Sequence, residues 1–160
     1  MKICKICANN DILCNVCNEK LAKGEITQLD VDISRAIEKL KNEFKIKNID
    51  FDFCLEGERT VYIFTKKSGG LIGPGGRNVK KLTEYLGKPV KIIEKTNNVK
   101  DLIEKLIGTS PLIGINILYK NGCEIFKVRL KKDFKKKLNI KELREIAKQA
   151  TGKDIEVVFE

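Results

Sequence analysis

The chain has 160 residues, of which 42% are hydrophobic and 34% are charged, with a formal net charge of +10. This composition predicts a folded protein of one ordinary domain or a few very small ones, and it excludes a disordered tail. The basic excess favours polyanions as partners, although surplus lysine also serves solubility alone. No apolar stretch approaches the roughly 20 residues of a membrane span, and the N-terminus lacks a signal-peptide core, so we expect a cytoplasmic protein without a membrane segment.

Four of the six cysteines fall within the first 17 residues, in the pattern C-x2-C-x6-C-x2-C. Each pair can offer two thiolates to one ion, and four soft ligands select tetrahedral zinc in a closed, structural site. An iron-sulfur cluster suits the same ligands, whereas disulfides would need an oxidising compartment that nothing else indicates. We therefore predict a zinc knuckle at residues 1–24 that needs its metal to fold. Its ligands are Cys4, Cys7, Cys14 and Cys17.

The first half of the remaining chain combines two helical patterns with three strand patterns. Apolar residues at helical spacing predict a helix from Leu29 to Phe44, and alternation predicts strands over 49–55 and 60–65 around a turn. A glycine-rich stretch follows, and then a helix over 77–86 and a strand over 89–94.

The second half repeats this order. We expect a helix over 99–107, a hairpin of strands over 113–119 and 123–130 joined by Asn121-Gly122, a helix over 140–150 and a strand over 154–159. Both halves therefore predict the order α-β-β-α-β, and we infer an α+β protein with a duplicated unit of roughly 60 residues. Cys54 and Cys123 fall in predicted strands, where we expect small buried hydrophobic residues without chemistry.

The stretch GLIGPGGRNVKK at residues 70–81 contains the glycine loop, Gly73-Pro74-Gly75-Gly76. Its bare backbone allows a close approach, and the N–H groups of the helix that follows point at any anion bound there. No Gly-Lys-Ser/Thr follows, and Asn78 stands where a dinucleotide fingerprint needs glycine, so both nucleotide motifs fail. The remaining alternatives are a polymer phosphate and a simple tight turn.

A GxxG loop between helices resembles the KH domain, which clamps about four nucleotides of single-stranded backbone. Residues 71–81 are similar to the loop and helix of the tandem KH domains in NusA-type transcription factors, and the helix before the hairpin indicates the type II order. The resemblance implies a KH domain with a GxxG loop at 29–95. It also implies a degenerate KH-like domain at 98–160, in which the basic residues 131–137 replace the loop.

The resemblance and the neighbouring charges together define a candidate nucleic-acid contact. Val79 and Leu82 are either part of an apolar groove wall or part of the core. The x-x pair of this loop carries no basic residue, so Arg77 would have to compensate. The candidate contact residues are Ile72, Gly73, Pro74, Gly75, Gly76, Arg77, Lys80 and Lys81.

The expected function is single-stranded RNA binding without catalysis, in a transcription- or translation-associated factor. The zinc knuckle would dock a partner such as RNA polymerase or the ribosome. The alternatives are a scaffold whose zinc and KH-like modules bind only protein, and a binder of single-stranded DNA. An enzyme is disfavoured because the chain has no histidine and no matched carboxylate or nucleophile constellation.

Overall fold

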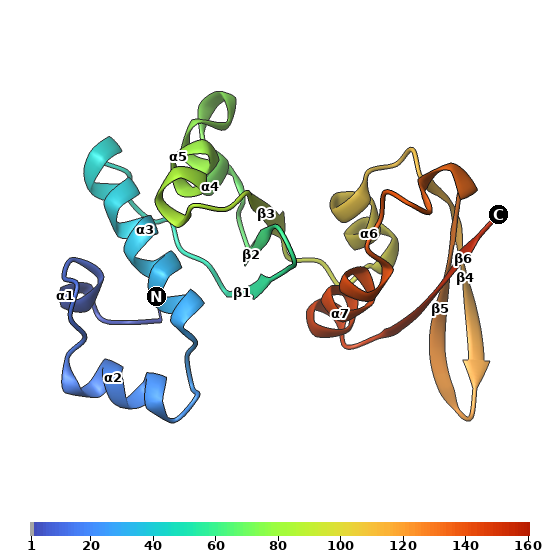
Figure 1. Cartoon of the computed structure of the whole chain (residues 1–160), viewed down its shortest axis with the longest axis horizontal. Helices are drawn as coiled ribbons and strands as arrows, with labels where there is room; N and C mark the ends of the chain where they lie inside the picture. The colour runs from blue at the N-terminus through green and yellow to red at the C-terminus, as the bar shows by residue number, and fades with distance from the viewer. Residues whose placement is uncertain (1) are drawn as a thin grey trace. The chain divides into compact units, whose positions relative to one another are not determined.

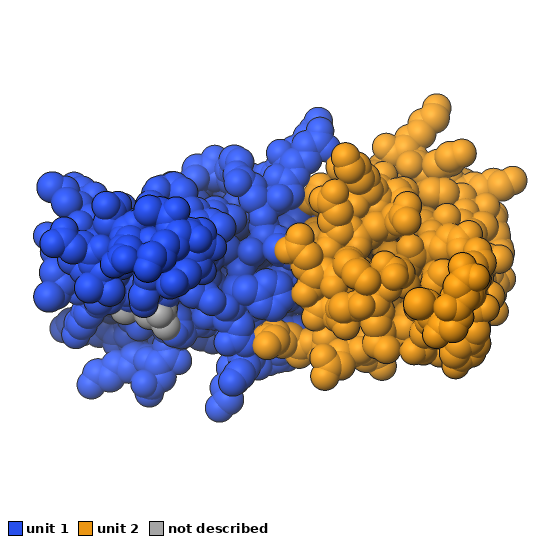
Figure 2. All heavy atoms as spheres, turned by 90° about the horizontal axis from the view of Figure 1, so that it is seen from below, with its two compact units in different colours: residues 1–94 blue, residues 95–160 orange. Residues whose placement is uncertain are grey.

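The computed structural model describes residues 2–160 and divides into two compact units, Met1–Glu94 and Lys95–Glu160 (Figure 2). Each unit contains one three-stranded sheet together with helices (Figure 1). The predicted α+β class is therefore confirmed. Among the described helices, none is both long and apolar enough to cross a bilayer.

Unit 1 begins with two short helices, α1 (Lys5–Ala8) and α2 (Asn15–Ala22), which with their flanking loops form the cysteine module, residues 2–26. The long helix α3 (Gln28–Phe44) follows. It starts at a capping box, in which the Thr27 hydroxyl accepts from the Asp30 N–H at 3.2 Å and the Asp30 carboxylate accepts from the Thr27 N–H at 2.9 Å. It ends at Lys45, whose backbone is left-handed with φ of 53°.

The sheet of unit 1 contains β1 (Phe53–Glu56), β2 (Val61–Thr65) and β3 (Val90–Glu94). The central strand β2 pairs with β1 in the antiparallel sense and with β3 in the parallel sense. The first strand begins four residues later than predicted. Asn48 has φ of 60°, and the Asp50 carbonyl accepts a hydrogen bond from the Thr65 hydroxyl at 3.0 Å, so residues 49–52 enter the core as a loop.

Two helices lie between β2 and β3 in the chain. The short helix α4 (Gly69–Ile72) leads into a 3-10 turn (Pro74–Gly76) and then into α5 (Arg77–Leu86), which has the predicted bounds. Gly87 ends α5 with φ of 73°, as expected for a glycine cap. The core of unit 1 joins α3 and the sheet to the start of α4 and the middle of α5, and includes Ile33, Ile37, Leu40, Ile63, Leu71 and Leu82.

Unit 2 repeats the arrangement with α6 (Val99–Ile107), β4 (Leu112–Lys120), β5 (Cys123–Leu130), α7 (Ile140–Thr151) and β6 (Asp154–Phe159). Its central strand β5 pairs with β4 in the antiparallel sense and with β6 in the parallel sense. The two sheets thus share order and sense, as the inferred duplication requires. The hairpin turn has positive φ at both Asn121 and Gly122, the geometry of a two-residue type I′ turn.

The β4–β5 hairpin and the isolated cysteines depart from the sequence expectation. Ile117 and Tyr119 continue the apolar alternation of β4, yet they are 49% and 77% exposed. Cys123 is also exposed, so its predicted burial is wrong: it opens β5 directly after the hairpin turn. Cys54 is half-buried, and burial raises the pKa of its thiol, which donates to the Asp30 carboxylate at 3.1 Å.

Candidate functional sites

The two cysteine pairs occupy equivalent positions in two short helices. Cys4 and Cys14 are the N-caps of α1 and α2, and Cys7 and Cys17 are the third residues of those helices. Their four sulfur atoms all lie within 4.8 Å of one another. Four sulfurs about 2.3 Å from a tetrahedral ion would be separated by about 3.8 Å, so the group fits one metal ion. The structure therefore brings together all four cysteines predicted from the spacing.

Backbone hydrogen bonds link the two turns reciprocally. The N–H of Cys4 donates to the Cys17 sulfur at 3.4 Å, and the N–H of Cys14 donates to the Cys7 sulfur at 3.1 Å. In each case the exposed cysteine of one turn supports the buried cysteine of the other. These two bonds hold the cysteine turns of α1 and α2 against each other, so that all four sulfur atoms converge.

The thiols differ in acidity. The backbone N–H of Cys17 is the main reason that the pKa of Cys14 falls to about 7, and the N–H of Cys7 likewise lowers the pKa of Cys4. The N–H of Cys14 acts in the same direction on Cys7, but burial and the three neighbouring sulfurs outweigh it and raise the pKa of Cys7 to about 12. Four thiols so close together do not all ionise alone, and a bound cation removes this conflict.

The cysteine module is attached to α3 by apolar and polar contacts. Ile3, Cys7, Cys17 and Ile26 form a small cluster with Val31 of α3. Arg35 of α3 donates from Nε to the Cys7 carbonyl at 3.3 Å. The sequence patterns gave no sign of this attachment, because helical periodicity identifies an apolar face but not its partner.

Asn9 provides a second polar link between the module and α3. Its amide donates to the Lys5 carbonyl at 2.9 Å and to the Glu38 carboxylate at 3.3 Å, and its oxygen accepts from the Asn42 amide at 3.1 Å. Asn9 therefore connects α1 to the C-terminal half of α3.

The glycine loop has positive φ at Gly73, Gly75 and Gly76, with values of 73°, 61° and 76°. The conformation of the turn itself therefore accounts for three of the glycines. The N–H of Gly76 donates to the Gly73 carbonyl and that of Arg77 to the Pro74 carbonyl, so these two groups are used within the turn. Pro74 and Gly75 remain exposed.

The buried Asn78 side chain holds the loop in place, a role that the sequence patterns did not indicate. Its side chain is 2% exposed and donates from Nδ2 to the Gly70 carbonyl at 2.7 Å. A Cβ atom on Gly73 would lie 2.5 Å from its Cγ, so this glycine is needed for space as well as for conformation. Only a short amide side chain at the start of a helix hints at this role from sequence.

The candidate basic residues differ in how freely they are displayed. The Arg77 guanidinium lies over the Phe44 ring at 4.1 Å, and its Nε donates to the Asn78 oxygen at 3.2 Å. Lys81 lies 3.5 Å from both the Glu43 and the Glu84 carboxylates, and Glu43 is the main cause of its raised pKa. Lys80 is exposed.

The candidate apolar residues separate into surface and core. Ile72 is 36% exposed beside the loop, and Val79 is half-buried one turn into α5. Leu82 is fully buried in the core of unit 1, so of its two interpretations the structure supports the core residue.

In unit 2, residues 131–137 form a different structure at the position of the loop. A 3-10 turn (Lys132–Phe134) leads toward α7, and Phe134 is half-buried under the Lys137 ammonium at 5.7 Å. The five lysines of this segment are exposed.

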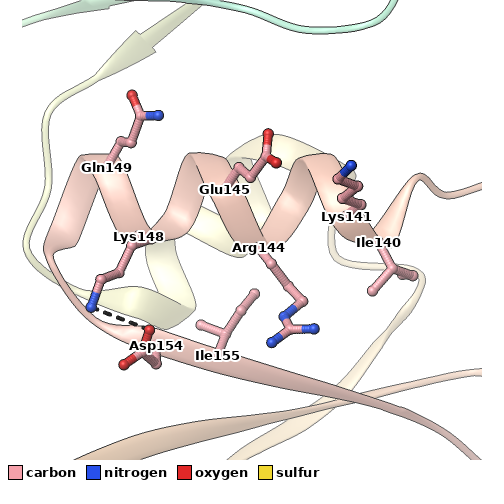
Figure 3. A pocket seen from close by; sticks show the side chains of 8 residues that line it. All are labelled: Ile140, Lys141, Arg144, Glu145, Lys148, Gln149, Asp154 and Ile155. Atoms are coloured by element: carbon pink, nitrogen blue, oxygen red, sulfur yellow. Dashed lines mark ion pairs between the residues drawn. The ribbon is translucent and has the colours of Figure 1, made fainter.

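A groove of about 460 Å³ lies between α7 and the start of β6 (Figure 3). Arg144 extends from α7 toward β6 beside Ile155, while Glu145 and Gln149 point away to the other side of the helix (Figure 3). Lys148 pairs with Asp154 at 3.2 Å across one end of the groove. The lining thus combines two isoleucines with charged side chains of both signs.

No protein-family model matches this chain. Comparison with curated proteins finds a similarity over part of it. Curated relatives include the small ribosomal subunit protein uS3 of Mesomycoplasma hyopneumoniae, strains J and 232, each 39% identical over 62 residues. The match covers 39% of this chain and 27% of the relative, so the chain spans about a quarter of the length of these proteins.

Among solved structures, the crystal structure of APE1850 is similar, with a TM-score of 0.60 and 23% sequence identity. The similarity covers 84% of this chain and 100% of the other. At this identity it shows a shared fold. The chain is therefore an α+β protein with a metal-ready cysteine cluster and partial similarity to a ribosomal protein.

Proposed function

We propose that this protein binds single-stranded RNA, with the glycine loop as a clamp on the sugar-phosphate backbone. The observation that carries the proposal is the loop itself, an exposed Pro74-Gly75 tip between two helices, in a chain similar to uS3 over 62 residues. The glycines leave the backbone open where a polymer would approach, and the basic residues Arg77 and Lys80 follow in the sequence. Such a loop clamps about four nucleotides.

We propose that each αββαβ unit is a KH-like domain of type II that resembles the tandem domains of NusA-type factors. The first domain spans residues 29–95 and the second spans residues 98–160. In both units a third strand runs parallel to the middle strand after the second main helix. Only the first unit has a glycine loop. In the second, the groove beside Arg144 and the lysines of residues 131–137 would contact phosphates without reading sequence.

The metal proposed for the cysteine cluster is zinc, in a structural role. Four thiolates complete a tetrahedral shell and leave no position for a substrate or a reactive water. We propose that the protein has no catalytic activity. The metal would supply folding free energy to a module whose buried apolar residues are few.

The test is a fluorescence titration of single-stranded RNA with the variant P74D/G75D. Gly75 has φ of 61° and a Cβ there would meet nothing within 4 Å, so aspartate, which tolerates this region, is accommodated. Two negative charges at the tip should repel the backbone and reduce RNA affinity strongly at moderate salt. Unchanged affinity would show that the loop is not the clamp.

The matched control is G24D/G87D. Both glycines have positive φ and open space around a Cβ, so this variant introduces the same two charges, with at least as much backbone strain, away from the loop. It should bind RNA nearly as well as the parent. A parallel titration with single-stranded DNA measures the preference for the 2′-hydroxyl and tests the DNA alternative.

A protein scaffold is the second candidate, because the cysteine module exposes aliphatic side chains. Ile6, Ile12 and Val16 are 73%, 83% and 63% exposed. They suit a protein partner, for which the ribosome and RNA polymerase are the proposed candidates in the cytoplasm. Salt dependence separates the two functions: for an RNA clamp, log affinity falls with log salt with a slope near −0.7 per phosphate contacted, and a protein contact need not follow this slope.

A further inference from the structure

A hollow of about 550 Å³ lies in unit 1 where the cysteine module meets the end of α3. Four lysines line it, and they come from three different segments. Lys5 belongs to α1, Lys41 to the last turn of α3, and Lys45 and Lys47 to the chain that follows. One carboxylate, that of Glu38, shares the lining.

The positive charge of this hollow is not balanced within the described part of the chain. None of the four lysine ammonium groups has an ion-pair partner among residues 2–160. Glu38 is 5% exposed, and its carboxylate accepts from the Asn9 amide at 3.3 Å. Four cations and one engaged carboxylate form a site for a polyanion.

Helix geometry accounts for only two of these lysines. The C-terminal carbonyls of α3 favour nearby cations, which explains Lys41 and Lys45. Lys5 lies on a different helix, and Lys47 lies beyond the end of α3, so neither is required for this compensation. The C-terminus of α3 therefore does not explain why Lys5 and Lys47 line the same hollow.

The hollow and the start of α5 both adjoin the end of α3. Phe44, the last residue of α3, carries the Arg77 guanidinium on its ring at 4.1 Å, and the next residue is Lys45. Glu43 lies at the same end. Its carboxylate accepts a hydrogen bond from the Tyr85 hydroxyl and pairs with Lys81, which offsets its negative charge. Arg77 and Lys45 therefore both lie at the C-terminal end of α3.

We propose that this lysine hollow is a second backbone-binding surface, which holds the phosphates of a single-stranded RNA as it leaves the glycine loop. The inference rests on the proposed function of the loop and extends it to a longer RNA. Lysine ammonium groups act as point charges for phosphate, so the contact adds affinity and length dependence without base specificity. The cysteine module contributes Lys5 and so takes part in RNA binding.

The test compares two RNAs with the parent and the variant K5Q/K47Q. One is a uridine oligomer of about four nucleotides, which only the loop engages, and the other is a uridine oligomer of about 12 nucleotides. The variant should bind the short RNA like the parent and bind the long RNA more weakly. For the long RNA, the slope of log affinity against log salt should decrease in magnitude by about 0.7 for each lost phosphate contact.

The control K20Q/K23Q removes the same charge from the C-terminal end of α2 and its cap in the same module, where Lys23 is paired with Glu19. It should leave the slope for the long RNA unchanged. Equal losses in both variants, or no loss in K5Q/K47Q, would overturn the lysine hollow while P74D/G75D still reports on the clamp. If neither RNA binds the parent protein, the proposed function itself fails and the hollow fails with it.

Discussion

The Asn78 side chain donates a hydrogen bond from Nδ2 to the Gly70 carbonyl at 2.7 Å. This bond joins the first turn of α5 to the start of α4, across the glycine loop. The same side chain leaves no space for a Cβ on Gly73. The shape of the loop is thus fixed by one buried amide.

Replacement of this amide should loosen the loop. In N78A the half-buried Gly70 carbonyl loses its donor, and loss of a hydrogen bond of this kind costs about 0.5–1.5 kcal/mol. Amide hydrogen exchange should become faster over residues 70–76. The control N97A removes an exposed asparagine and should leave exchange there unchanged. If exchange over 70–76 is the same in N78A and the parent, Asn78 does not organise the loop.

Two glycine substitutions separate conformational strain from steric conflict. Gly73 has φ of 73° and ψ of 173°, a region that costs other residues about 1–3 kcal/mol, and its Cβ would also meet Asn78. Gly75 has φ of 61° and ψ of 20° in open space, where only the left-handed cost of about 1–2 kcal/mol applies. G73A should therefore lower the melting temperature more than G75A. Equal shifts would contradict the contact with Asn78.

Metal removal should unfold the cysteine module selectively. Native mass spectrometry should find one zinc ion per chain in the parent and none in C17S, because each cysteine is one of four ligands. The control C123S changes an exposed cysteine outside the cluster and should keep its zinc. Chelation should accelerate amide exchange over residues 2–26 and leave residues 95–160 unchanged. Iron in place of zinc, with visible absorbance, would contradict the assignment.

Tyr85 should titrate at unusually high pH. Burial, followed by its hydrogen bond to Glu43, raises the pKa of the phenol from 10.0 to about 12. The folded-state pKa lies above the unfolded value, so this contribution to stability is present below pH 10 and is lost as pH rises through about 12. Ultraviolet titration should show a late phenolate step that Y85F lacks and Y119F keeps. A parent without this step would contradict the contact.

Most elements could be predicted because their signals are local. The helix over 77–86, its Gly87 cap and the Asn121-Gly122 turn each depend on residues within a few positions. The first strand was predicted too long because Ile49 and Phe51 alternate like strand residues. They are buried in a loop instead, and alternation does not distinguish the two cases.

The cysteine cluster could be predicted because the spacing of the cysteines is itself the signal. The rest of the candidate sites depends on partners far apart in sequence. Arg77 meets Phe44 across 33 positions, and Arg35 meets the Cys7 carbonyl across 28. No local pattern specifies such pairs, so the sequence identified the cations of the loop but not the residues that hold them.

Helix α3 takes part in both candidate sites. Its first half holds the cysteine module through Val31 and Arg35, and its last residue, Phe44, holds Arg77 beside the glycine loop. We expect coupling between the two sites to pass through this helix. Thermodynamic linkage makes such coupling reciprocal, so the factor by which metal tightens RNA binding equals the factor by which RNA tightens metal binding. We therefore expect loss of the proposed zinc ion to weaken the proposed RNA binding without altering the loop itself.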